Sequence, residues 1–296
     1  MPDRHDHWIA GKPDAPAAGS YLPTIDPATR QPGDEIAAGT AADIDRAVAA
    51  ADDAQPGWAR TSGAQRSEAL HRVADAIEDG AGELMAWNLP LNQACRAVAP
   101  ALAVGNAVVA KPSELTSTST LHLARLATEA GLPDGLLNVV TGTGPGVGTP
   151  LAAHPVVRRV AFTGSVATGR HLATVAAGRL VPLTLELGGK SPLVVFADAD
   201  IERAVAAAVS AVAFNAGQVC SATTRLLVEA PAHDEVAARV VDAVARLAPG
   251  VDFGPMITEA QYDKVLEHVG AARAAGVEPA TGGGAYDEGP AAQGLY

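Results

Sequence analysis

The chain has 296 residues, of which 48% are hydrophobic and 18% charged, a balance typical of globular proteins that predicts two domains at this length. Its formal net charge of −12 disfavours nucleic acid and anionic lipid surfaces as partners, because an acidic chain repels phosphates. With no apolar stretch long enough to span a bilayer, no signal-peptide core and two cysteines, the sequence predicts a cytoplasmic protein with free thiols.

The predicted elements follow an extended arm, residues 1–39, that contains at most short strands. Two capping-box patterns, Thr40–Asp43 and Ser62–Gln65, predict helices over 44–54 and up to about residue 84. From there strands and helices alternate, which predicts an α/β fold with a parallel sheet and helical crossovers. Helices are expected over 91–104, 117–130, 167–177, 201–214, 233–247 and 259–275, and strands over 107–110, 136–140, 160–162, 183–186, 193–196 and 226–228.

Glycine-rich segments between strands and helices are the first candidates for ligand binding. The run 142–148 does not have G-x-G-x-x-G spacing and is more consistent with a turn. The segment 164–169 is followed by Arg170 where a P-loop requires lysine, and 189–191 has Thr184 in place of the first P-loop glycine. An NTPase is therefore disfavoured.

Three residues are candidates for chemistry on their local sequence alone. Cys220 lies among small residues that leave room for a substrate, whereas Cys95 lies in an apolar helix and is expected in the core. Glu186 lies in an otherwise apolar strand and is expected to be partly desolvated, which would raise its pKa toward that of a general base. The alternatives are an exposed residue at the end of a strand and a buried ion pair. The two histidines at 5–7 have no further ligands at metal-site spacing, so no metal site is predicted.

Five segments in one order carry a resemblance to a known family. They are Trp87-Asn88-Leu89-Pro90, Ala110-Lys111-Pro112-Ser113-Glu114, Phe162-Thr163-Gly164-Ser165 with Gly169, Leu185-Glu186-Leu187-Gly188-Gly189-Lys190-Ser191-Pro192 and Gly217-Gln218-Val219-Cys220. Together they resemble the aldehyde dehydrogenase superfamily of the NAD(P)-dependent, hydrolytic type, and the similarity runs from the N-terminal arm to the end of the chain.

The resemblance implies a catalytic set of three residues. Cys220 is the implied nucleophile that attacks an aldehyde carbon, and Asn88 with the Cys220 backbone N–H is implied to stabilise the oxyanion. Glu186 is implied to activate the water that hydrolyses the resulting thioester. The expected product is a carboxylic acid.

The resemblance also implies an NAD site. Lys111 and Glu114 are implied to hold the adenosine ribose, and Glu114 favours NAD over NADP because a carboxylate repels a 2′-phosphate. The residues implied to bind the cofactor are Trp87, Lys111, Ser113, Glu114, Thr163, Gly164, Ser165, Gly169 and Leu187.

The implied architecture is a Rossmann-like NAD-binding domain over 1–185 and a partial α/β catalytic domain over 186–296. The sequence departs from the family pattern near Ala86, where part of the oligomerisation element is expected to be missing, and it ends where the family continues. The family implies a homo-oligomer, although its pairing elements are missing here. The expected partner is a small-molecule aldehyde, with neither nucleic acid nor membrane.

Two alternatives remain at this point. The missing segments leave open a catalytically inactive family remnant that at most binds nucleotide. An acylating relative that passes the thioester to coenzyme A is disfavoured, because Glu186 supplies a base that such an enzyme does not need. No motif indicates which aldehyde is oxidised.

Overall fold

The computed structural model describes residues 2–80 and 90–296 and divides the chain into two compact units. The first unit comprises Met1–Ile25 and Pro32–Leu187, and the second comprises Asp26–Gln31 and Gly188–Tyr296. The junction after Leu187 lies close to the boundary that the sequence predicts at residue 185, whereas no pattern indicated that 26–31 belongs to the second unit. The roles assigned to the two domains stay predictions.

The N-terminal arm contains more strand than the sequence predicts. Strand β2 pairs antiparallel with β3 and with β7, while β5 pairs with β1 in parallel and with β4 antiparallel. A two-residue turn joins β2 to β3, and its residues Ala10 and Gly11 have the positive φ angles, 51° and 75°, that such hairpins require. The strands are β1 (Arg4–His5), β2 (His7–Ile9), β3 (Lys12–Asp14), β4 (Tyr21–Ile25) and β5 (Pro32–Ala37).

Both predicted capping boxes form, and each begins a long helix of the first unit. Helix α1 spans Ala41–Ala59, with the Thr40 backbone N–H donating to Asp43 Oδ2 at 2.7 Å. Helix α2 spans Gly63–Asp79, with Ser62 Oγ accepting from the Gln65 N–H at 3.2 Å. Helix α1 extends beyond the predicted range 44–54 at both ends, whereas α2 ends at Asp79, before the predicted end near residue 84.

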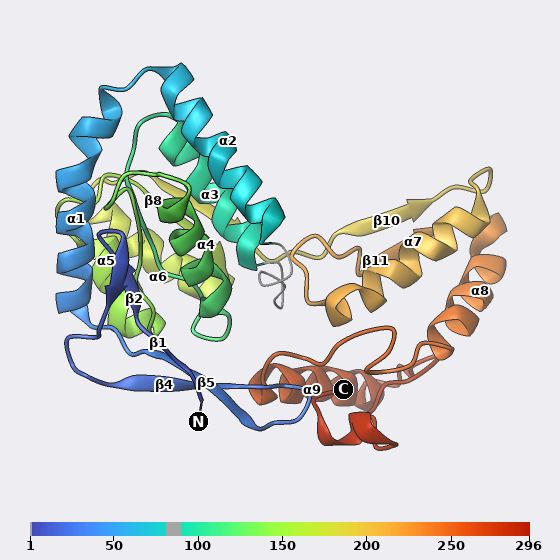
Figure 1. The fold of residues 1–296 in the computed structure, drawn as a ribbon. Coiled ribbons are helices and arrows are strands. Elements are labelled where there is room, and N and C mark those ends of the chain that lie inside the picture. The colour runs from blue at the N-terminus through green and yellow to red at the C-terminus, as the bar shows by residue number, and fades with distance from the viewer. Residues whose placement is uncertain (1, 81–89) are drawn as a thin grey trace. The chain divides into compact units, whose positions relative to one another are not determined.

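The rest of the first unit alternates strands and helices as predicted (Figure 1). Strands β6 and β7 pair in parallel, and so do β8 and β9. The α/β class is confirmed, but these two pairs lie in separate sheets among the described residues. The elements are α3 (Pro90–Ala103), β6 (Val108–Ala110), α4 (Ser117–Glu129), β7 (Leu137–Val139), η2 (Gly144–Gly148), α5 (Thr149–Ala153), β8 (Val160–Gly164), α6 (Val166–Ala177) and β9 (Leu183–Leu187).

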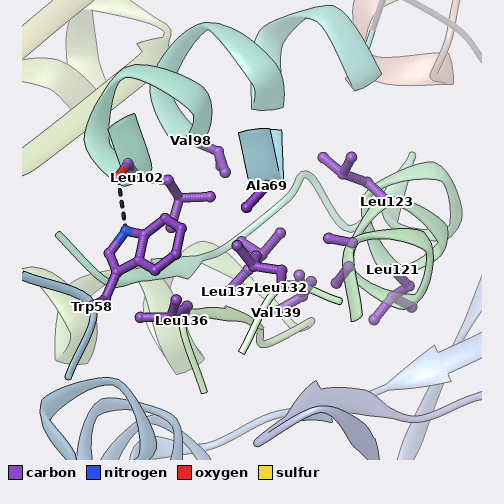
Figure 2. Packing of buried hydrophobic residues seen from close by; sticks show 12 residues of the cluster. Trp58, Ala69, Val98, Leu102, Leu121, Leu123, Leu132, Leu136, Leu137 and Val139 are labelled. Atoms are coloured by element: carbon purple, nitrogen blue, oxygen red, sulfur yellow. Dashed lines mark hydrogen bonds between the residues drawn. The ribbon is translucent and has the colours of Figure 1, made fainter. Parts of the chain in front are cut away.

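The main hydrophobic core of the first unit lies where α2, α3 and α4 meet one another and β7 (Figure 2). Its members are mostly aliphatic, as expected for a chain with few aromatic residues. Trp58 of α1 is the exception, and its indole Nε1–H donates to the Leu102 carbonyl at 2.8 Å, which satisfies the polar atom of a buried ring.

The second unit is a smaller α/β unit. Strands β10 and β11 pair in parallel, and α7 and α8 pack against each other, with a core around Val195, Ala232 and Val236. Its elements are β10 (Pro192–Val195), α7 (Ile201–Ala213), η3 (Phe214–Gly217), β11 (Arg225–Val228), η4 (Ala230–Ala232), α8 (His233–Ala245), α9 (Glu259–Ala274) and η5 (Pro290–Gln293). Within the described ranges, no helix is both long enough and apolar enough to cross a membrane.

Candidate active site

The segment Thr163–Ser165 lies where β8 ends and α6 begins. Ser165 caps the helix, its Oγ accepting from the Thr168 N–H at 3.1 Å. The segment is exposed, so the free N–H groups of the first turn of α6 are open to an anionic ligand. Strand β8 and α6 therefore form the strand-to-helix junction that a phosphate group requires.

Gly169 is buried and brings α6 close to the neighbouring strand. A Cβ at this position would lie 2.9 Å from Leu187 Cδ2 and 3.5 Å from Leu185 Cδ2. The absence of a side chain at Gly169 therefore lets α6 pack closely against β9. Leu187 is the β9 residue that contacts it most closely.

Strands β8 and β9 bring two sequence motifs together. In their parallel register Thr163 is opposite Glu186, and Gly164 is opposite Leu187. The candidate cofactor segment and the candidate base are thus neighbours on adjacent strands at one sheet end. This juxtaposition follows from the strand pairing and is invisible in either motif alone.

The expectation that Glu186 is desolvated is wrong. Its side chain is 56% exposed, which agrees with the alternative of an exposed residue near the end of a strand. Arg96 of α3 lies beside it, with 3.9 Å between Arg96 Nη2 and Glu186 Oε2. Sequence reasoning missed Arg96, since a single arginine on an amphipathic helix carries no signal of a partner ninety positions away.

Lys111 and Glu114 form an ion pair just after β6, with 2.9 Å between Lys111 Nζ and Glu114 Oε2. The ammonium is largely covered and the carboxylate is 41% exposed. Ser113 orders the same turn, because its carbonyl accepts from Ser117 Oγ at 2.8 Å. The two charged groups implied to hold a ribose are therefore fixed side by side at the carboxyl end of a parallel strand, where such sheets bind ligands.

The glycine run 142–148 is structural, as its spacing indicates. Gly144–Gly148 forms a π-helical turn capped by Thr143, and Val147 inside it is fully buried. A Cβ on Gly39 would lie 2.8 Å from Val147 Cγ1, so the arm and this turn pack closely.

Cys220 lies in an exposed turn of the second unit, after an unusual backbone segment. Asn215, Ala216 and Gly217 all have left-handed φ angles, 55°, 52° and 70°. Among the residues that the structure describes, none accepts a hydrogen bond from the Cys220 backbone N–H. Both the thiol and this N–H are therefore available to a substrate.

Residues of the glutamate signature also border the Cys220 turn. A Cβ on Gly189 would lie 3.8 Å from the Cys220 carbonyl oxygen, which is ordinary van der Waals contact. Gln218, inside the cysteine signature, makes three side-chain hydrogen bonds to backbone groups. Sequence reasoning gave Gln218 no role, because two of its partners lie far along the chain.

The remaining predicted residues have different outcomes. Cys95 is half-buried in α3, and burial raises the pKa of its thiol, which makes it the less reactive of the two cysteines. Asn88 and Trp87 lie outside the described residues.

Comparison with known proteins identifies the family. The aldehyde dehydrogenase family model matches residues 15–86 and 80–296. The chain belongs to the aldehyde dehydrogenase family. Its oxidoreductase class and the family resemblance of its motifs are thereby confirmed.

Individual relatives of this aldehyde dehydrogenase are longer than it is. It is 37% identical to a 3,6-anhydro-alpha-L-galactose dehydrogenase from Streptomyces coelicolor, over 95% of this chain and 71% of the relative. A variant of an aldehyde dehydrogenase from Pseudomonas syringae, solved with NAD+ and octanal, has a TM-score of 0.93 and 32% identity over 99% of this chain and 73% of that one. A betaine aldehyde dehydrogenase from Staphylococcus aureus, solved with NAD+, has a TM-score of 0.93 and 28% identity over 99% and 72%.

The comparisons also agree with the internal shortening that the sequence predicts near Ala86. The alignment with the S. coelicolor relative extends over 348 positions, whereas 95% of this 296-residue chain is about 281 residues, so about 67 positions have no counterpart here. The two parts matched by the family model meet at 80–86.

Proposed function

We propose that this chain is an NAD-dependent aldehyde dehydrogenase of the hydrolytic type, oxidising an aldehyde to a carboxylic acid. The observation that carries the proposal is the register of β8 and β9, which sets the candidate cofactor segment at Thr163 beside the candidate base Glu186. The exposed Cys220, in the family's cysteine signature, supplies the nucleophile that this base would serve.

In the proposed chemistry the Cys220 sulfur acts first as the nucleophile and later as the leaving group. Its sulfur forms a bond to the aldehyde carbon, and the resulting oxyanion accepts hydrogen bonds from the Cys220 backbone N–H and from the side-chain amide of Asn88. After the substrate carbon is oxidised, the sulfur carries a thioester. Glu186 takes a proton from water, the hydroxide attacks the thioester carbon, and the carbon–sulfur bond breaks to release the acid.

Two features of the first unit support NAD as the cofactor. NAD, when bound, supplies the hydride acceptor for this oxidation. The Lys111–Glu114 pair would hold the adenosine ribose, and the capped N-terminus of α6 at Ser165 would hold the pyrophosphate. We assign cofactor binding to this unit and nucleophilic catalysis to the second.

The two cysteines allow a matched test of this proposal. Purified wild type, Cys220→Ala and Cys95→Ala are assayed for NADH formation with NAD and an aliphatic aldehyde such as octanal. We expect Cys220→Ala to lose aldehyde-dependent NADH formation and Cys95→Ala to retain it. Equal rates in the wild type and in Cys220→Ala would refute the assignment of the nucleophile.

The internal shortening near Ala86 favours one alternative, a catalytically inactive family member that at most binds nucleotide. It is supported by the roughly 67 positions without a counterpart in the S. coelicolor relative. A folded wild-type chain that binds NAD in calorimetry, yet gives no Cys220-dependent NADH across a panel of aldehydes, would favour this alternative.

A further inference from the structure

Gln218 joins the Cys220 turn to a distant part of the second unit. Its Nε2 donates to the Asn215 carbonyl at 3.1 Å and to the Pro255 carbonyl at 3.3 Å. Its Oε1 accepts from the Ile257 backbone N–H at 3.1 Å. One half-buried amide therefore makes three backbone hydrogen bonds, two of them to the segment that leads into α9.

The backbone that these bonds hold is unfavourable by itself. Asn215 and Ala216 both carry a Cβ, yet both have left-handed φ angles, which persist only where the surroundings fix them. The Gln218 side chain contacts the first of these residues directly, and the Gln218 backbone N–H also donates to the Asn215 carbonyl at 3.0 Å. The side chain thus ties the left-handed turn to the 255–257 segment.

Only an amide of this length meets both requirements. Two backbone carbonyls need an N–H₂ donor, and the Ile257 N–H needs an acceptor on the same side chain. Glutamate would keep the acceptor and bring a negative charge against two carbonyl oxygens. Methionine would keep the approximate shape and lose all three bonds.

We propose that Gln218 is a positioning residue for Cys220, which tethers the nucleophile's turn to the 255–257 segment and thereby fixes the direction of the Cys220 thiol and backbone N–H. The inference rests on the proposed function in so far as it assigns the nucleophile to Cys220. Its physical content, the tether, is independent of turnover.

Hydrogen–deuterium exchange of the full chain tests the tether without any assay of activity. In Gln218→Met we expect the hydrogen-bonded amides of residues 218, 222, 256 and 257 to exchange about tenfold faster than in the wild type, with α7 unchanged. Gln261→Met is the control, because Gln261 is an exposed glutamine on the first turn of α9 in the same unit. Unchanged exchange in Gln218→Met would overturn the tether, and Gln218→Glu serves if the methionine variant does not fold.

Kinetics test the consequence for catalysis. We expect kcat of Gln218→Met to fall about 10- to 100-fold, as for a small misplacement of a reacting group, with KM for the aldehyde changed less than about threefold. Labelling of Cys220 by iodoacetamide should persist, because the thiol stays exposed. A variant with faster exchange and an unchanged kcat would refute the positioning role. Wild type without Cys220-dependent turnover would instead refute the proposed function and leave the tether to be decided by exchange.

Discussion

Thr163 and Glu186 are directly opposite each other in the parallel pairing of β8 with β9. Each lies one residue before the end of its strand, and the strand of Thr163 leads into the N-terminus of α6. Parallel pairing makes both carboxyl ends face the same way, so a group bound at α6 and a water held by Glu186 share one sheet end. The proximity of Thr163 to Glu186 is the basis for the effect expected of a substitution at Glu186.

Replacing Glu186 with glutamine should separate the two halves of the reaction. The amide has the same shape but cannot take a proton from water, so the thioester on Cys220 should form and then persist. We expect a burst of about one NADH per chain, followed by a steady-state rate lower by roughly 10²–10⁴-fold. Rapid-mixing measurement of NADH absorbance checks this, with Glu202→Gln on α7 as control. A full steady-state rate without a burst would show that Glu186 is not the base.

The charge of Glu114 should determine the cofactor preference. Its carboxylate lies 2.9 Å from Lys111 Nζ and would repel a ribose 2′-phosphate. Glu114→Gln removes that repulsion and frees the lysine, so we expect kcat/KM for NADP relative to NAD to rise about tenfold. Glu129→Gln on α4, which removes an ion pair with Arg125 of the same 2.9 Å length, should leave the ratio unchanged. An unaltered ratio in Glu114→Gln would place the ribose elsewhere.

Local signals in the sequence predicted much of this fold. The Thr40 and Ser62 caps form as their spacing indicates, because a capping box depends on residues three apart. The short strands of the arm were harder to predict, since β2 exists through pairings such as Trp8 with Val139, far along the chain. A strand of three residues has little periodicity of its own.

The candidate site also has a part that the sequence predicted and a part that it did not. The motif residues were found because each signature is contiguous. The exposure of Glu186 depends on which elements cover its face of β9, and no local pattern encodes that. Arg96 and Gln218 were missed for the related reason that their contacts join segments distant in sequence. Non-local pairing is what the structure adds.

The core of the first unit should be sensitive to truncation of a single side chain. Leu136 is fully buried in the cluster around Trp58 (Figure 2). Leu180 is 92% exposed. We expect Leu136→Ala to lower the free energy of unfolding by about 2–5 kcal/mol and Leu180→Ala by less than about 0.5 kcal/mol. Urea unfolding followed by circular dichroism measures both. Similar values for the two variants would contradict the assignment of this core.

His7 should make folding stability depend on pH below about 6.5, the ordinary pKa of an unfolded histidine. It is fully buried, and its Nδ1 accepts from the Thr141 N–H at 3.2 Å, so Nε2 carries the proton of the neutral ring. Burial lowers the pKa of His7, although Asp43 Oδ1 lies 3.6 Å from Nε2 and opposes the shift. The unfolded chain therefore binds a proton more readily than the folded chain, and stability is lost as pH falls below the unfolded value of about 6.5.

The expected contribution of His7 has a slope of up to about 1.4 kcal/mol per pH unit in the free energy of unfolding, within the window from about 6.5 down to the lowered folded pKa. His7→Gln should remove it, because glutamine can accept the Thr141 N–H without titrating. His233→Gln, at an exposed histidine on α8, should keep the wild-type slope.

Asp43 contributes to the pH dependence of stability in a lower pH window. Burial raises its pKa, but hydrogen bonds from the Ala17 and Thr40 N–H groups outweigh this and hold the pKa below its usual value. Its contribution to stability is therefore lost only as pH falls below about 4. Urea titrations at several pH values distinguish the two windows, and a slope that survives in His7→Gln would mean that another group senses the proton.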